Sequence, residues 1–461
     1  MTGFREESDS MGTVSVPENA YYGAQTVRAS GNFSISGLRL QPVFIRAAAL
    51  IKKQGAITNR DLCLLDDRKA DAVISAAEQI VSGEFSDQFI IDVFQTGSGT
   101  STNMNMNEVI AGRANEILTG KRGGKTPVHP NDHVNMGQSS NDVIPSAMHI
   151  ASSVEINDLL LPAMNRLSRS LDEKAEEFGT IRKTARTHLQ DAVPVSLGQE
   201  FGGFARQVRL NMERLSGIEK RLCELSLGGT AVGTGVNTHP EFAGRTIKGI
   251  ALETGLNFRE ALNHFEAQAS KDTIVELSGI LKTFSVSLIK ISNDLRWLSS
   301  GPRCGIGEIR LPALQPGSSI MPGKVNPVIP EAVIQAAAQV IGNDTVITLC
   351  GHSGNFELNV MMPLMAYNII QSIQLLGSAS NALTDRCIKG ISADREKCES
   401  NLEKSISLAT ALAPETGYDR AAEIAKEAFN NGKTIRETLK EKKILPDEKA
   451  DFLLDRMIRG D

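Results

Sequence analysis

The segment GSSIMPGKVNP, residues 317–327, carries the residue types that a loop uses to hold a small anion. It offers two hydroxyls, several backbone N–H groups, the ammonium of Lys324 and the amide of Asn326. A nucleotide-binding P-loop has four residues between its glycines and a Ser or Thr after its lysine. Here five residues separate Gly317 from Gly323, a valine follows the lysine, and a proline removes a backbone donor. The pattern therefore excludes a P-loop and favours a small carboxylate as the ligand.

Two further segments are rich in hydroxyl and amide side chains, and each precedes a helical pattern. They are QTGSGTSTNMNMNEV, residues 95–109, and HPNDHVNMGQSSNDVIP, residues 129–145. Side chains at such positions cap the helix or, with its N-terminal N–H groups, hold an anion. Capping is the simpler interpretation of the first segment taken alone, and Pro145 fits the first turn of a helix in the second. The first segment offers Ser98, Thr100, Ser101, Thr102 and Asn103 for either role, and the second offers Ser139, Ser140, Asn141 and Asp142.

Three histidines lie in or near such loops. His129 and His133 are four residues apart, which resembles metal-ligand spacing. Pro130 and the polar run argue against a regular helix there, so no metal site is predicted. His188 follows Thr187 in RTHLQD. A lone histidine is usually structural, but the adjacent hydroxyl and the acids elsewhere in the chain favour a role in proton transfer.

Long helical patterns dominate the rest of the chain. They cover residues 152–178, 196–227, 265–298, 328–350 and 357–386, the last of them broken near Pro363. The stretch 265–298 contains no proline and a single glycine, so it predicts a helix of roughly 50 Å. Because helices of this length need partners along their surface, the sequence predicts a mainly α protein built on a helical bundle.

The glycine- and proline-rich segments fall between these helices. They are residues 95–103, 120–142, 228–240, 300–327 and 350–356. The polar chemistry lies in the same loops, except in 228–240, where a tight connection between packed helices is favoured over chemistry. The sequence divides into an N-terminal domain (1–139), a central long-helix domain (140–395) and a small helical C-terminal domain (396–461).

The composition limits the partners and the compartment. With 461 residues and a net charge of −5, the chain has no basic field for nucleic acid, so an anionic substrate must be held by local donors. Its six cysteines are scattered without a Cys-x-x-Cys pair, which fits a reducing compartment. The N-terminus has neither a signal nor a transit pattern, and no apolar run is long enough to span a membrane. We expect a cytoplasmic protein without membrane contact.

Six segments, taken in order, resemble the class II fumarases of the fumarase/aspartase superfamily. They are TGSGTSTNMNMNEV, HPNDHVNMGQSSNDV, RTHLQDAVPVSLGQE, LGGTAVGTGVNTHPEF, SGPRCGIGEI and GSSIMPGKVNP. The resemblance extends from about Gly12 to Ile424. It implies a mainly α lyase that interconverts fumarate and (S)-malate by anti addition of water, through an aci-carboxylate carbanion and without a metal or organic cofactor.

The resemblance also implies roles for individual residues. Ser318 matches the catalytic base, and backbone donors from the loop's glycines, with Lys324 nearby, would stabilise its anion. His188, oriented by Glu331, matches the residue that handles water, while Lys324 and Asn326 would stabilise the carbanion. The order of proton transfers between Ser318 and His188 stays open. The substrate-binding set would be Ser98, Thr100, Ser139, Ser140, Asn141, Thr187 and Asn326.

A second, peripheral dicarboxylate site is implied by the same resemblance. It would use His129, Asn131 and Asp132. The chain departs from the family around this site, because Thr126 stands where a basic residue is common and His133 where Asp is common.

Aspartase is the nearest alternative, since it shares the fold and the Gly-Ser-Ser-Ile-Met-Pro loop. His188, Ser140 and Gly323 favour fumarase, because aspartases carry Gln, Thr and usually Ala there, whereas the residues around Glu331 are more like aspartase. A non-catalytic, crystallin-like scaffold is a third alternative, and the complete set of catalytic residues argues against it.

The resemblance finally implies an assembly. Fumarases are homotetramers whose central bundle covers apolar helix faces, and the longest predicted helix here is apolar on more than one face. Each active site would combine loops from three subunits: one near Thr100 and Asn141, one near His188, and one near Ser318 and Lys324.

Overall fold

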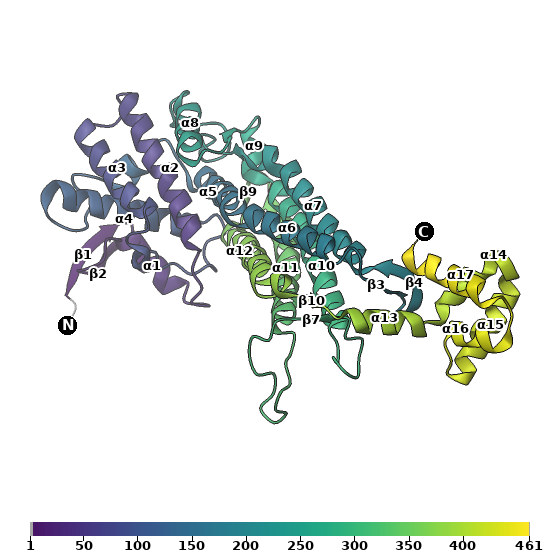
Figure 1. Cartoon of the computed structure of the whole chain (residues 1–461). Helices are drawn as coiled ribbons and strands as arrows, with labels where there is room; N and C mark the ends of the chain where they lie inside the picture. Colours follow the sequence, from purple (N-terminus) through teal and green to yellow (C-terminus); the bar gives the residue numbers. More distant parts are fainter. Residues whose placement is uncertain (1–2, 461) are drawn as a thin grey trace. The chain divides into compact units, whose positions relative to one another are not determined.

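The computed structural model describes residues 3–460, and this range is mainly helical (Figure 1). The chain is 63% helical, with 17 α-helices and five two-stranded sheets in the described range. The predicted fold class is therefore confirmed. The chain forms two compact units, which we call unit 1 (Met1–Pro162, Asn211–Ser285, Ala336–Ser378) and unit 2 (Ala163–Leu210, Val286–Gln335, Ala379–Asp461).

Unit 1 contains two hairpins, a short parallel pair and a set of helices. Its elements are β1 (Phe4–Asp9), β2 (Gly12–Pro17), α1 (Ala24–Asn32), α2 (Pro42–Asp61), α3 (Asp67–Val81), η1 (Ser86–Gln88), α4 (Thr100–Thr119), η2 (Pro130–Val134), α5 (Ser140–Glu155), η3 (Ile156–Leu160), β5 (Glu224–Leu225), α8 (Phe242–Thr254), β6 (Arg259–Glu260), α9 (His264–Ala269), β8 (Gly354–Asn355) and β9 (Leu358–Asn359). β1 pairs with β2 and β8 with β9 in antiparallel fashion, while β5 and β6 are parallel.

Helix α2 is central to the packing of unit 1. It lies against α3, α5 and α8, and it buries Phe44 and Ile51 completely. Helix α4 buries polar as well as apolar side chains, with Asn103, Asn107 and Glu108 in the interior. The Glu108 carboxylate accepts hydrogen bonds from the first N–H groups of α1, so one buried acid fixes where that helix begins.

Five long helices contribute residues to both units. They are α6 (Leu161–Glu177), α7 (Leu197–Leu222), α10 (Asp272–Leu298), α11 (Val328–Gly351) and α12 (Met362–Arg386). Within unit 1, Asp344 of α11 binds Ser278 and Lys282 of α10, and Asn343 of α11 donates to Gln371 and Ser372 of α12. These polar contacts tie the long helices together side by side.

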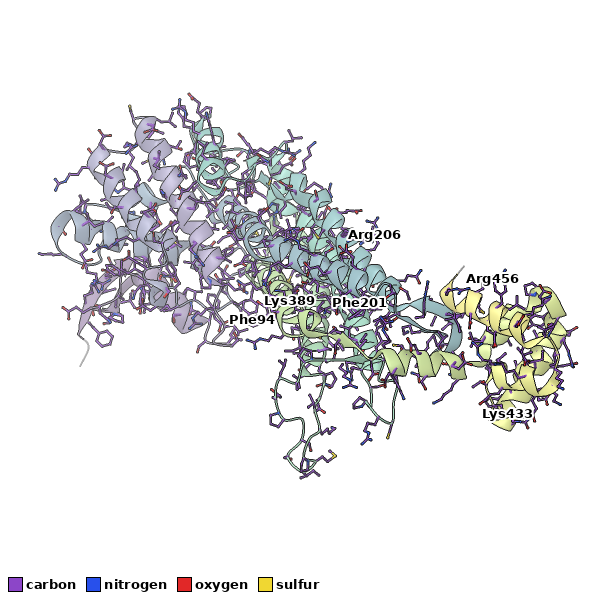
Figure 2. The ribbon with its side chains drawn as sticks, viewed as in Figure 1. Phe94, Phe201, Arg206, Lys389, Lys433 and Arg456 are labelled. Atoms are coloured by element: carbon purple, nitrogen blue, oxygen red, sulfur yellow. The ribbon has the colours of Figure 1, made fainter. Side chains whose placement is uncertain are left out.

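Unit 2 adds a hairpin and a group of C-terminal helices. Its other elements are β3 (Arg182–Thr187), β4 (Gln190–Ser196), β7 (Ile309–Arg310), η4 (Ile388–Gly390), β10 (Ser392–Ala393), α13 (Arg395–Lys404), η5 (Ile406–Leu412), α14 (Ala413–Thr416), α15 (Tyr418–Asn431), α16 (Ile435–Lys442) and α17 (Asp447–Arg459). β3–β4 and β7–β10 are antiparallel pairs. Phe201 of α7, labelled in Figure 2, packs edge-to-face against Phe178 and Phe204.

The C-terminal helices enclose a core of their own. Leu408, Ile424, Leu439 and Leu454 are among its buried side chains. Arg436 of α16 links two of the neighbouring helices, because its guanidinium binds acids of α13 and α17. The division into three domains stays a prediction, with this core as the feature that supports a separate C-terminal domain.

Two predicted helices have different bounds in the structure. The stretch 265–298 is split, because Ser270 is extended and the buried Lys271 ammonium donates to three carbonyls at the end of α9. The stretch 357–386 starts only at Met362, after β8 and β9. Pro363 does not break it, because Pro363 occupies the first turn of α12, where no N–H is needed.

Helix α11 is the only described helix that is long and apolar enough, by composition, to cross a membrane. Its best window has a mean hydropathy of 1.2, so the expectation that no apolar run reaches this length is wrong. A single such helix is weak evidence for a membrane span, because core helices pass the same test. Only 39% of that window is buried within the chain, so much of its apolar surface has no cover there.

Candidate active site

The loop 317–327 closes on itself through Gly317. The Gly317 N–H donates to the Lys324 carbonyl at 2.8 Å, and Asn326 Nδ2 donates to the Gly317 carbonyl at 2.7 Å. A Cβ on residue 317 would lie 2.5 Å from the Lys324 carbonyl oxygen, so this neck requires glycine. The closure holds Lys324 and Asn326 at the base of the loop, directly before α11. Figure 1 shows the loop extending from the helices between β7 and α11.

Ser318 lies just inside this neck. Its Oγ accepts hydrogen bonds from the N–H groups of Ile320 at 3.2 Å and Met321 at 3.0 Å. The donors are therefore not the loop's glycines, which instead shape its turn and neck. N–H donors aimed at a hydroxyl oxygen stabilise its anion more than its neutral form. Ser318 and Lys324 also line one hollow of about 440 Å³.

A larger cleft, of about 630 Å³, brings three of the predicted residues together. Lys324, Asn326 and Glu331 all line it. Glu331 occupies the first turn of α11, where the helix dipole favours its negative charge. Other charged or aromatic side chains that line the cleft are Arg296, Trp297 and Arg310.

Thr187 and His188 stand at the tip of the β3–β4 hairpin. Thr187 pairs with Gln190, so His188 and Leu189 form a two-residue turn with φ of 56° and 60°. Both positive angles match a type I′ turn, which usually contains Asn and Gly. Two bulky residues there store strain of the kind found at functional sites. His188 is exposed in this chain, so it is not a core histidine.

The predicted pairing of His188 with Glu331 is not seen in the chain. Both residues lie in unit 2, and the described part of that unit has no hydrogen bond between them. The orientation of His188 by Glu331 stays a prediction.

Ser98 and Thr100 meet at the start of α4. Their hydroxyl oxygens are 2.8 Å apart. The backbone here passes very close to a neighbour, because a Cβ on Gly97 would lie 1.6 Å from the Val360 carbonyl oxygen. Neither hydroxyl caps the helix, whose N-cap is glycine; Gln95 Oε1 instead accepts from the Thr102 N–H at 3.0 Å. Capping, the simpler interpretation from sequence, is therefore wrong for this pair.

At the start of α5 the hydroxyls of Ser139 and Ser140 make different contacts. Ser139 is the N-cap and forms a capping box with Asp142. Ser140 is buried, and its Oγ accepts from Asn103 Nδ2 of α4 at 3.2 Å, which brings the two helix starts together. Asn141 Nδ2 donates to the Ala231 carbonyl at 2.7 Å. With Ser139 as the cap, Pro145 is the sixth helical residue rather than part of the first turn.

The loop 228–240 anchors this helix start. The N–H groups of Gly228 and Thr230 donate to the buried Asp142 carboxylate at 3.0 and 2.9 Å. The loop also supplies the carbonyl that holds Asn141. It therefore has the packing role that the sequence favours for it.

The predicted peripheral site begins in a π-helix, η2. No regular α-helix forms here, as the sequence predicts: the five-residue π-helix starts at Pro130, whose missing N–H costs nothing at that position, and His129 is the extended N-cap before it. His129 Nδ1 accepts from the N–H groups of Asn131 and Asp132, and His133 Nδ1 accepts from the His129 N–H. Lys69 Nζ lies 3.4 Å from His133 Nε2. Within residues 3–460 no group of three His, Cys, Asp or Glu side chains could hold a metal ion.

Comparison with known proteins adds the family. A lyase family model matches residues 12–342, and a model of the fumarase C C-terminus matches residues 408–457. The class II fumarate hydratase of Nitrosomonas europaea is 53% identical over 437 residues, which cover 95% of each chain. This chain belongs to the class II fumarate hydratase family.

Other members of the family are also similar to this chain over nearly its whole length. The human mitochondrial fumarate hydratase is 50% identical over 450 residues, which cover 97% of this chain and 88% of that protein. The crystal structure of class II fumarase from Schistosoma mansoni has a TM-score of 0.95 at 38% identity and covers 99% of this chain and 98% of its own. The chain is thus a lyase of the fumarate hydratase class, as its ordered motifs predict.

The sequence does not reveal an ionic cluster that involves the β3–β4 hairpin. Arg186 donates both Nη atoms to the two carboxylate oxygens of Glu308, at 3.0 and 2.8 Å. Lys183 lies 3.3 Å from the same carboxylate and 2.8 Å from Glu200. Burial tends to raise the pKa of Glu308, but the Arg186 hydrogen bonds and the charges of Lys183 and Arg186 outweigh it and hold that pKa below its usual range. Nothing in the spacing of these residues marks them, since they meet only in the fold.

Proposed function

We propose that the chain catalyses the reversible anti addition of water to fumarate, giving (S)-malate. The single observation that carries the proposal is the loop 317–327, in which Ser318, Lys324 and Asn326 share one closed turn. Membership of the class II fumarate hydratase family supports the reaction.

In the malate direction a base removes a proton from the carbon next to a carboxylate. That proton is weakly acidic, so the carbanion forms only if its charge moves into the carboxylate as an aci-carboxylate. Lys324 and Asn326, which line the same cleft, are the donors for those oxygens. One well-placed donor to a developing oxyanion contributes roughly 3–4 kcal/mol.

Ser318 is the base. A free hydroxyl is a poor base at neutral pH, so its anion must be stabilised. The N–H groups of Ile320 and Met321 point at its Oγ, and the Lys324 ammonium borders the same hollow. His188, on its strained turn, handles the water, with Glu331 as its partner in the working site.

The remaining residues hold the substrate carboxylates with neutral donors. We assign this role to the hydroxyl pair of Ser98 and Thr100, to Asn141 and to Thr187. Ser139 and Ser140 contribute mainly by shaping the helix start, because their hydroxyls already bind within the chain.

A second dicarboxylate site at His129, Asn131 and Asp132 is part of the proposal. Its N–H groups at 131 and 132 are aimed at the His129 ring, and Lys69 with His133 supplies the nearest basic groups.

We further propose a homotetramer in which three subunits build each active site. The support from this chain is the apolar surface of α11, which is poorly covered, and the exposed Val286 of α10. The cytoplasm is the proposed compartment, because all six cysteines, each within the described range, are free thiols.

Ultraviolet absorbance of fumarate tests the function. Purified protein given malate alone should produce fumarate, and protein given aspartate should not. Release of fumarate and ammonia from aspartate, with malate inert, would instead identify an aspartate ammonia-lyase.

A further inference from the structure

A buried lysine lies beneath the two helix starts of unit 1. Lys52, in the middle of α2, is 0% exposed. Its Nζ donates to Asn135 Oδ1 at 2.9 Å. Burying an ammonium costs free energy, and apolar residues often stabilise such a position as well or better. The presence of a lysine there therefore needs a reason other than stability.

Asn135 connects this lysine to α4. Its Oδ1 also accepts from Asn103 Nδ2 and Asn107 Nδ2, both at 3.1 Å. Its own Nδ2 donates to the Gln138 carbonyl at 3.1 Å, just before α5. A single amide oxygen thus collects one ammonium and two amide donors, which fixes its orientation.

Asn103 carries the connection to the candidate substrate site. Its Nδ2 donates to Ser140 Oγ at 3.2 Å as well as to Asn135. Ser140 directly precedes Asn141, the proposed carboxylate ligand, on the first turn of α5. The hydrogen bonds therefore run from Lys52 through Asn135 and Asn103 to Ser140 without a gap.

Asp142 supplies the opposite charge. Its carboxylate is 0% exposed and accepts three backbone N–H bonds. Burial lowers the pKa of Lys52 and raises the pKa of Asp142, while attraction between the two groups opposes both shifts. Asp142 thus lies buried under the α5 start, where its carboxylate holds the first turn through these three N–H bonds.

We propose that Lys52 is a positioning residue for substrate binding, which sets the Ser140–Asn141 turn through Asn135 and Asn103. The inference rests on the proposed function. A failure of this inference can be told apart from a failure of the proposed function, because wild-type activity tests the function and the variants test the connection from Lys52 to Ser140.

The experiment compares Lys52→Met with Lys53→Met. Methionine keeps the length of the side chain and removes the donor. Lys53 is its neighbour on α2 but binds the surface acids Glu78 and Glu253, so its loss is the matched control. We expect Lys52→Met to raise the KM for malate about tenfold with kcat changed less than threefold, and Lys53→Met to match wild type. Calorimetry with succinate, a dicarboxylate that does not react, should show the same tenfold weakening.

Asn103→Ala extends the test and serves if Lys52→Met fails to fold. It breaks the same connection without touching the lysine, so it should raise KM similarly. The KM of the double variant should not exceed the higher KM of the two single variants, because either substitution alone already breaks the connection. Unchanged KM in a folded Lys52→Met or Asn103→Ala protein, additive effects in the double variant, or equal losses in KM and kcat would overturn the proposal.

Discussion

Ser318 is the residue that we propose as the catalytic base. Its neighbours donate two N–H groups to Oγ, an arrangement suited to a hydroxyl that must lose its proton. We expect Ser318→Ala to lower kcat by about 10²–10⁴ with KM little changed, since a general base acts in the transition state. Asn141→Ala should instead raise KM as well, because its amide is the proposed ligand of the ground-state carboxylate. Steady-state kinetics check both, and a Ser318→Ala variant with near wild-type kcat would remove the serine from the base role.

Asp92 should make the free energy of unfolding depend on pH in the acid range. Burial works to raise its pKa, but the N–H groups of Ser36, Gly37 and Phe94 and the Ser36 hydroxyl outweigh burial and lower the pKa to about 2. A pKa below the unfolded value means that the unfolded chain binds more protons, so the stabilisation is full above pH 4 and is lost as pH falls towards 2. It amounts to about 2.5 kcal/mol at pH 7.

Asp92→Asn tests this sensitivity directly. Its loss of stability relative to wild type should be full at pH 7 and about half as large at pH 3, by the same linkage. Urea unfolding at both values measures it, with the oligomeric state recorded at each pH. A deficit that does not depend on pH would show that the charge of Asp92 is not what these hydrogen bonds stabilise.

At the scale of elements, the tip of the β3–β4 hairpin follows a residue of the ionic cluster around Glu308, Arg186. The bidentate contact of Arg186 with buried Glu308 lies next to the turn that presents Thr187 and His188. Lysine keeps the charge but cannot make both bonds. We expect Arg186→Lys to lower kcat about tenfold, equivalent to 1.4 kcal/mol, while the protein stays folded.

The control for this hairpin variant is Arg420→Lys, at a surface pair with Glu423. It should have wild-type kinetics. A fully active Arg186→Lys protein would show that the bidentate Arg186–Glu308 contact is not needed to position His188.

The elements also show what the sequence could and could not predict. Apolar periodicity predicts the long helices because a 3.6-residue pattern is local. It misses the break at Ser270, which depends on Lys271 reaching back to carbonyls of α9. The ordered motifs identified the candidate site, because each loop is contiguous in sequence. The cluster around Glu308 and the connection from Lys52 could not be predicted, since their members come from distant segments and meet only on folding.

For the whole molecule, composite active sites make a prediction about mixtures. If loops from three subunits build each site, Asn141→Ala and Ser318→Ala proteins should each be inactive or weak alone. Unfolded together and refolded, some mixed tetramers would contain a site with only intact loops, so activity should partly return. Activity of the mixture against each variant refolded alone, with size from light scattering, measures this. A mixture no better than its parents despite subunit exchange would contradict the shared site.

The position of Trp297 has a practical consequence. It is the chain's single tryptophan, it is 51% exposed, and it lines the cleft shared by Lys324, Asn326 and Glu331. The tryptophan fluorescence of the protein therefore comes from one indole, which stands beside the proposed chemistry. Titration with malate should change its emission and saturate, and a Lys324→Ala variant should lose that response. The chain thus carries its own optical probe, by which ligand binding can be followed in stopped flow without a label.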